Sequence, residues 1–187
     1  MFYENTKFDF TSILESNWLV IKQELSQLQR SNFIPWKETF LYGKGWDVFG
    51  LYAFGTKLAD NCRLCPETTR LAEMIPGMTT AGFSSLAPGT HILPHIGYSY
   101  SYSEDSGEPE RVYSGEYEGV PSLNKAVLRC HLGLIVPDGC AIRVGFLTRN
   151  WQEGKCLIFD DTIVHEAWNR GNATRVLLLI DFKKPNT

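Results

Sequence analysis

Two of the four histidines stand in sequence settings that suit metal binding. His95 follows Pro94, which restrains the backbone in front of the imidazole, and Gly97 leaves space beside it. His165 comes after a hydrophobic run and a polar turn over 157–164, so a strand delivers its imidazole. Imidazole is a favoured ligand for iron and zinc. Spacing alone does not separate a metal-binding pair from two hydrogen-bonded structural histidines, and both interpretations stay open at this point.

Two arginines in apolar runs indicate an anionic partner. In the run 127–134, β-strand alternation places Arg129 and His131 on one face, and Arg175 stands at the entrance of the hydrophobic run 174–181. Burying an unpaired guanidinium is costly, so each arginine needs a partner. A small dicarboxylate bound by the guanidinium fork is one candidate, and two such arginines in one barrel interior would favour it. The other candidates are protein carboxylates, namely Asp160, Asp161 and Asp181.

Hydrophobic periodicity predicts the elements that position these residues. Apolar residues at three- and four-residue steps predict an amphipathic helix over 11–30, with Ser12 and Glu15 spaced as a capping box. Pro66 predicts the start of a second helix over 66–75. We therefore expect a sandwich or jelly roll with helices buttressing one sheet. The expected strands lie near 47–54, 79–86, 126–136, 140–147, 155–160 and 174–183.

Length and composition narrow the class of protein. A chain of 187 residues that is 43% hydrophobic suits a single domain over 1–187. The net charge of -3 without a long basic run argues against nucleic acid as a partner. The chain has neither a signal-like start nor an apolar run near the ~20 residues that span a bilayer, so we expect no membrane partner and a cytoplasmic location. Five cysteines, an odd number, fit reduced thiols.

An insertion over 98–124 differs in composition from the rest of the chain. It holds five of the eight tyrosines and six acidic residues, with Arg111 as its only Lys or Arg. Such a long loop is either functional or a solvated insertion. It begins just after His95 and ends just before Arg129, so it is a candidate lid. Its acids would favour a cationic or neutral substrate over an acidic one.

Several short motifs occur in a set order from Ser84 to Asp181. They are Pro88-Gly89-Thr90-His91, Pro94-His95-Ile96-Gly97, Leu128-Arg129-Cys130-His131-Leu132-Gly133-Leu134, Trp151-Gln152-Glu153-Gly154-Lys155, Phe159-Asp160-Asp161-Thr162, His165-Glu166-Ala167-Trp168 and Arg175. In order and spacing, the set resembles the aspartyl/asparaginyl beta-hydroxylase family. The resemblance implies a mainly β fold, a double-stranded β-helix (a cupin-like jelly roll) over about 79–183 with buttressing N-terminal helices and strands in 1–78.

The same resemblance implies a set of cofactors and site residues. The cofactors are Fe(II), 2-oxoglutarate as cosubstrate, and O2. His95 and His165 would bind the iron, and Arg175 would hold the distal carboxylate of 2-oxoglutarate. The remaining oxygens of 2-oxoglutarate would be held by Ser84, Arg129 and His131.

The acid of the usual 2-His-1-carboxylate iron site is missing here. Most non-haem iron oxygenases carry it two positions after the first histidine, where this chain has Gly97. The beta-hydroxylase family resembles the chain in this gap. Asp160 and Asp161 are the acids nearest to a ligand, and we expect them to form a turn or to support the ligands rather than to coordinate the metal.

Two positions depart from the peptide-hydroxylating members of the family. Those members carry basic residues where this chain has Gly82 and Val127, which argues against a peptidyl-aspartate substrate. The sequence predicts an iron(II)/2-oxoglutarate-dependent hydroxylase of an unactivated C–H bond. The expected site of hydroxylation is the β-carbon of an Asp/Asn-like or other amino-acid residue, in a peptide, on a carrier or free, while a lipid acyl chain stays open.

The alternative is a non-catalytic cupin-type protein that binds a metal or a small acid. Such a protein would also use histidines on a jelly roll. The pair Arg129 and Arg175 favours the enzyme, because a metal-only site does not need two groups that bind anions.

Overall fold

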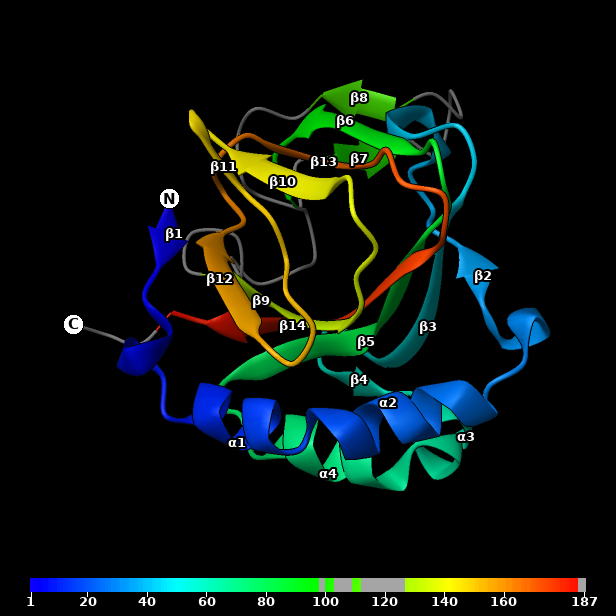
Figure 1. The fold of residues 1–187 in the computed structure, drawn as a ribbon, viewed down its shortest axis with the longest axis vertical. Helices are drawn as coiled ribbons and strands as arrows, with labels where there is room; N and C mark the ends of the chain where they lie inside the picture. The colour runs from blue at the N-terminus through cyan, green and yellow to red at the C-terminus, as the bar shows by residue number, and fades with distance from the viewer. Residues whose placement is uncertain (98–99, 103–108, 112–126, 185–187) are drawn as a thin grey trace.

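Two β-sheets face each other, and the helices of the N-terminal part of the chain cover the outer face of the larger one (Figure 1). The computed structural model describes residues 1–97, 100–102, 109–111 and 127–184. This architecture confirms the prediction of a mainly β, double-stranded β-helix with buttressing N-terminal helices. The predicted lid over 98–124 lies outside the described residues, apart from the backbone of β7 (Tyr100–Tyr102) and β8 (Pro109–Arg111), which pair with each other.

The larger sheet has eight strands and the smaller one four. The smaller sheet has the order β11 (Leu147–Arg149), β10 (Cys140–Val144), β13 (His165–Asn169) and β6 (His91–His95). The larger sheet runs through β1 (Phe2–Tyr3), β12 (Cys156–Asp160), β9 (Val127–Ile135), β14 (Arg175–Lys183), β5 (Met78–Leu86), β3 (Trp46–Ala53) and β2 (Ile34–Pro35), and β4 (Thr56–Lys57) pairs with β3.

The larger sheet is hydrophobic on both faces. One face packs against the helices, and the other faces the smaller sheet. Phe83 and Leu178 face the helices, whereas Leu177 and Phe159 face the smaller sheet and pack with Ile142. Residues that alternate with the helix-facing set therefore point into the space between the sheets. All five cysteines are buried with free thiols.

The N-terminal helix is broken where the periodicity predicts one continuous element. It forms α1 (Phe10–Ser16) and α2 (Trp18–Gln27), separated at Asn17, whose side chain donates a 2.8 Å hydrogen bond to the carbonyl of Ile13. The predicted capping box is wrong. Ser12 donates to the Asp9 carbonyl, while the Glu15 carboxylate accepts from the backbone N–H of Cys156 and so attaches the helix to β12. Tertiary contacts override the local pattern here.

The second predicted helix is present as α4 (Pro66–Glu73), and a further helix that the sequence did not predict, α3 (Ala59–Leu64), precedes it. Among the described residues, no helix has the length and apolar character that crossing a bilayer requires. The sequence also missed β6 and β13. β6 contains Pro94, which interrupts a strand pattern but is tolerated because β6 is an edge strand of its sheet.

Candidate active site

His95 and His165 lie side by side between the two sheets. They end β6 and begin β13, they are paired in register, and their ring centroids are 4.3 Å apart. The Nδ1 atom of His95 is 2.7 Å from the Leu93 carbonyl, and that of His165 is 2.8 Å from the Ile163 carbonyl. Because a carbonyl only accepts, each Nδ1 carries the proton and each Nε2 keeps a lone pair for a ligand.

Burial keeps both imidazoles neutral. It lowers the pKa of His95 to about 3, with the neighbouring His165 adding to the effect. It lowers the pKa of His165 to about 4, helped by the positive charge of Arg129. A neutral imidazole is the form that binds a metal ion, so the pair is already in the required protonation state near neutral pH.

The carboxylate of Asp161 occupies the space beside Gly97. A Cβ built on Gly97 would lie 1.6 Å from Asp161 Oδ2, so no side chain fits at this position. Asp161 is fully buried, and its Oδ1 lies 3.4 Å from Nε2 of His165. Burial raises the pKa of Asp161 to about 6 against the opposing effect of Arg129. Asp161 thus brings a carboxyl group next to the histidines, while Asp160 forms the turn by accepting from Thr162.

Arg129 is held by protein carboxylates. Its guanidinium binds Asp181 through two hydrogen bonds, of 2.6 and 2.9 Å, and its Nη1 lies 2.8 Å from Asp161 Oδ1. The sequence left open whether Arg129 pairs with a small dicarboxylate ligand or with protein carboxylates. The structure shows two protein carboxylates, Asp181 and Asp161. The resemblance implied that Arg129 contacts 2-oxoglutarate. Arg129 could do so only while it also binds Asp181 and Asp161.

We expect Arg129→Met to destabilise the fold. The substitution leaves the buried carboxylates of Asp161 and Asp181 without the guanidinium that neutralises them, and breaking a buried ion pair costs about 3–5 kcal/mol. Urea denaturation followed by circular dichroism should show a fall of that size in the free energy of unfolding. The matched control is Arg143→Met, which removes a half-exposed arginine paired with Glu166 and should cost less than about 1 kcal/mol. Equal small losses would contradict the prediction.

Arg175 is a buried cation in a different situation. Its side chain is 2% exposed, and its guanidinium carbon lies 4.9 Å from the ring centroid of Trp151. Within the described ranges no carboxylate lies at ion-pair distance, and its Nε has no hydrogen-bond partner. Burial lowers the pKa of Arg175 to about 10, so it stays charged at neutral pH. A buried charge of this kind calls for an anionic ligand.

Two further donors face the same space. His131 accepts a 3.2 Å hydrogen bond on Nδ1 from the indole of Trp151, which places its proton on Nε2, a buried atom with no partner among the described residues. Burial and the two nearby arginines hold the pKa of His131 well below its usual range, so the ring is neutral. Ser84 accepts on Oγ from the indole of Trp46, which leaves its own proton to donate.

One cavity collects every site residue that the sequence singled out. The two-residue periodicity of β5, β9 and β14 turns Ser84, Arg129 and His131 to the inner face, and Arg175 joins them at the start of β14. The cavity is lined by Trp46, Ser84, Ile92, His95, Arg129, His131, Ile142, Trp151, Phe159, His165, Ala167, Arg175 and Leu179.

This donor set suits a metal ion together with a carboxylate ligand. Two neutral Nε2 atoms can hold a divalent iron, and an unpaired guanidinium with nearby N–H and O–H donors can hold a small acid. No cluster of three or more His, Cys, Asp or Glu side chains within metal-binding reach occurs in the described part of the chain.

Comparison with known proteins identifies a family whose match includes all of these site residues. The family model for aspartyl/asparaginyl beta-hydroxylase matches residues 15–185. The chain belongs to this family. An ornithine lipid ester-linked acyl 2-hydroxylase of Rhizobium tropici is 38% identical over 98% of this chain and 60% of its own length. The human aspartyl/asparaginyl beta-hydroxylase is 31% identical over 92% of this chain and 21% of its own length. The chain thus spans less than two thirds of either relative.

Solved structures support the fold of this beta-hydroxylase family member. A 2-oxoglutarate/Fe(II) oxygenase family protein from Burkholderia pseudomallei superposes with a TM-score of 0.56 at 11% identity, covering 91% of this chain and 79% of the other. A Pseudomonas putida prolyl-4-hydroxylase superposes with a TM-score of 0.50 at 13% identity, covering 94% and 100%. At this identity the likeness concerns the fold alone.

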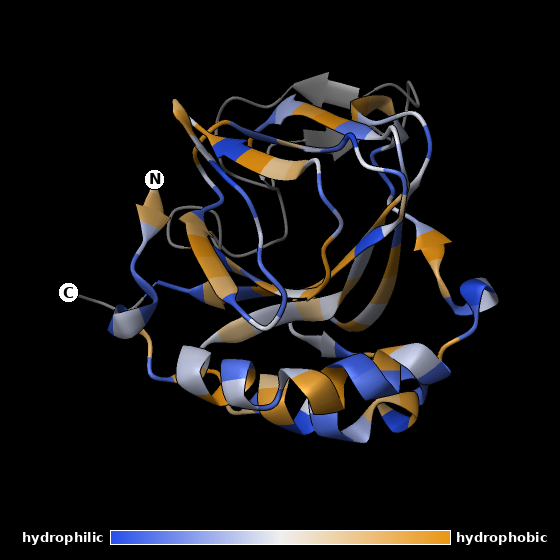
Figure 2. Ribbon diagram, in the orientation of Figure 1, coloured by the Kyte–Doolittle hydropathy of each residue, from blue (hydrophilic) through white to orange (hydrophobic). Residues whose placement is uncertain are grey.

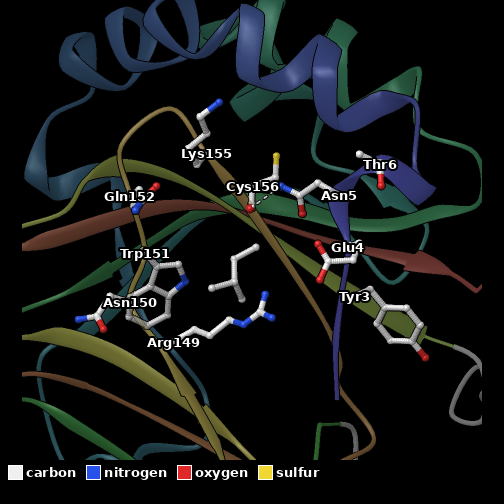
Figure 3. A pocket seen from close by; sticks show the side chains of 11 residues that line it. Tyr3, Glu4, Asn5, Thr6, Arg149, Asn150, Trp151, Gln152, Lys155 and Cys156 are labelled. Carbon is white, nitrogen blue, oxygen red and sulfur yellow. Dashed lines mark hydrogen bonds between the residues drawn. The ribbon is translucent and has the colours of Figure 1, made fainter.

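The chain also has a polar pocket of about 270 Å³ between its N-terminal segment and the strand that carries Arg149 (Figure 3). Trp151 lines both this pocket and the histidine cavity. In the pocket, the side-chain amide of Asn5 donates a hydrogen bond to the carbonyl of Cys156. The ammonium group of Lys155 donates one to the carboxylate of Glu15. The pocket therefore lies on the outer side of the tryptophan that stacks on Arg175.

Sequence reasoning missed two residues of the site. Trp46 and Trp151 orient Ser84 and His131 through their indole N–H groups. Trp151 occurs in one of the family motifs, which was the available signal, whereas Trp46 lies at the edge of an expected strand and carried none.

Proposed function

We propose that the protein is an iron(II)- and 2-oxoglutarate-dependent dioxygenase that hydroxylates an unactivated C–H bond. The observation that carries the proposal is the buried Arg175, which has no carboxylate partner among the described residues and lines the same cavity as two neutral histidines. His95 and His165 would hold the iron. When bound, iron(II) supplies the activation of dioxygen that no side chain can provide.

The residues of the chain bind and orient the cosubstrate in this proposal. The fork of Arg175 binds one carboxylate of 2-oxoglutarate, and a cation–π contact with Trp151, 4.9 Å from the guanidinium carbon to the ring centroid, helps to hold the guanidinium in the cavity. His131 Nε2–H and the Ser84 hydroxyl donate to the remaining oxygens. Arg129, which already binds two carboxylates, holds Asp161 beside the histidines. Apolar side chains such as Phe159 and Ile92 keep water away from the site.

The named relatives act on two substrate classes, an acyl group of a lipid and aspartyl or asparaginyl residues. The prediction from sequence was an Asp/Asn-like or other amino-acid residue, in a peptide, on a carrier or free. Gly82 lies on the cavity-facing side of β5 and offers no cation for an acidic side chain. A neutral substrate group therefore suits the proposed enzyme better than an aspartate carboxylate.

The proposal is tested by following the cosubstrate and the oxygen atom. Protein supplied with iron(II), 2-oxoglutarate and isotopically labelled dioxygen should form succinate, and mass spectrometry of candidate substrates should show the gain of one labelled oxygen. His95→Ala serves as the inactive control. Metal binding without any binding of 2-oxoglutarate would instead support the non-catalytic cupin-type alternative.

A further inference from the structure

An apolar groove with a volume of about 470 Å³ adjoins the histidine cavity. Ser84 and Leu179 line both spaces, so the groove lies next to the place where we expect chemistry. It runs along the segment 34–38 and strands β3 and β5. Figure 2 shows hydrophobic colour on β2 at this edge of the larger sheet. The volume lies within the roughly 300–1,000 Å³ that is typical of small-molecule sites.

Exposed apolar side chains form part of the groove lining. Ile34 is 62% exposed and Phe54 is 54% exposed. Half-buried apolar residues complete this part of the lining, among them Val48, Ala53 and Leu58. The groove thus offers an apolar surface beside the histidine cavity.

Two polar side chains along the groove are hydrogen-bonded within the protein. The side-chain amide of Asn61 donates to the carbonyl of Gly50 at 2.7 Å, and the indole of Trp36 donates to Glu38 at 2.5 Å. Strands β3 and β5 pair with each other along this wall. A peptide would need backbone partners here, whereas an aliphatic chain needs none.

Two glycines lie opposite each other in the wall of the groove. Gly50 and Gly82 are direct partners across β3 and β5, and Gly82 is also paired with Leu179. A Cβ at Gly50 would meet Leu58 at 3.0 Å, and one at Gly82 would lie 2.6 Å from the Phe49 carbonyl. Neither position has room for a side chain, so this part of the wall is formed by backbone and by Leu58.

We propose that this groove binds the acyl chain of a lipid-like substrate and presents a carbon of that chain to the histidine cavity. The inference rests on the proposed function, because it names the substrate class of that same site. The largely apolar lining, its place beside the cavity and the hydrogen-bonded Asn61 and Trp36 fit one aliphatic chain.

The binding test uses neutral probes, so that a carboxylate cannot be captured by Arg175. Dansyl sulfonamides of octylamine, decylamine and dodecylamine are titrated into the purified full chain, and the dansyl fluorescence is followed. We expect saturable binding whose affinity rises about fourfold per added methylene, which is the worth of about 0.8 kcal/mol per buried CH2. Affinity that does not depend on chain length would overturn the proposal.

Substitutions that fill the groove locate the binding site. Leu58→Trp and Ala53→Trp should weaken binding of the dodecyl probe at least tenfold, because each places an indole in the path of the chain. Leu64→Trp is the matched control, since Leu64 is a half-exposed leucine of α3 that does not line the groove, and it should bind as the unmodified protein does. Ala53 lies near the end of β3 and is half-buried, so its variant keeps the test available if Leu58→Trp does not fold. Unchanged affinity in a folded groove variant would place the chain elsewhere.

A parallel assay separates failure of the groove from failure of the proposed function. Conversion of 2-oxoglutarate to succinate without added substrate should survive in both groove variants, because they leave the histidine cavity intact. Chain binding without any iron-dependent succinate formation would refute the proposed function and leave the groove standing. Succinate formation without chain binding, or hydroxylation of an aspartate- or asparagine-containing peptide instead of an acyl chain, would refute the groove proposal alone.

Discussion

The His165→Ala variant is expected to lose iron binding and with it all hydroxylation. His95 and His165 would be the two protein ligands, and a single imidazole does not retain the metal against solvent. Iron(II) is titrated anaerobically into the variant, and binding is measured by calorimetry. We expect the affinity to fall at least a hundredfold, because loss of a residue that only supports a metal ligand already costs about 10- to 100-fold. Labelled oxygen should no longer appear in the product.

The control for this experiment is His91→Ala. His91 belongs to the same strand as His95, but its side chain is 42% exposed and is paired with Glu166 at 2.7 Å. Its replacement should leave iron affinity unchanged. If His165→Ala bound iron as tightly as this control does, the two buried histidines would be structural residues.

Arg175→Ala is expected to raise the KM for 2-oxoglutarate at least tenfold. Charge-assisted hydrogen bonds contribute about 1.5–3 kcal/mol each, and the substitution removes both arms of the guanidinium fork. Arg175→Lys should restore the KM only in part, because a point charge replaces a planar fork. Steady-state kinetics with varied 2-oxoglutarate measures both effects.

The matched arginine is Arg149, which lines the polar pocket together with Trp151 (Figure 3) and does not line the histidine cavity. Arg149→Ala should leave the KM for 2-oxoglutarate unchanged. Stability gives a second readout: Arg175 has no carboxylate partner among the described residues, so its removal should cost less unfolding free energy than the removal of Arg129. An unchanged KM in Arg175→Ala would show that this residue does not bind the cosubstrate.

Local patterns in the sequence determined much of this protein. Side-chain alternation is a property of one strand, so the run around Arg129 and His131 showed which residues share a face before any partner strand was known. The same reasoning indicated the interior position of Arg175, and the resemblance supplied its role. The histidine pair could be identified as a candidate, although its 4.3 Å ring separation depends on the pairing of β6 with β13.

Contacts between distant segments decided what the sequence left open. Asp181 faces Arg129 because β14 pairs with β9 in one particular register, and a shift of one residue would turn Asp181 to the helix side. This register makes Arg129 a partner of protein carboxylates. Sequence reasoning gave Arg175 the same candidate partners, but Arg175 has no carboxylate partner within the described residues.

Two further features could not be predicted from the sequence: that the Asp161 carboxylate fills the space beside Gly97, and that an apolar groove exists. Asp161 reaches Gly97 from another turn of the chain, and the groove arises where β3 and β5 bring two glycines opposite each other beside the segment 34–38. Both features depend on the distance between backbones that are far apart along the chain. Periodicity reports the face on which a side chain lies, but only tertiary packing fixes what stands opposite it and how much space remains.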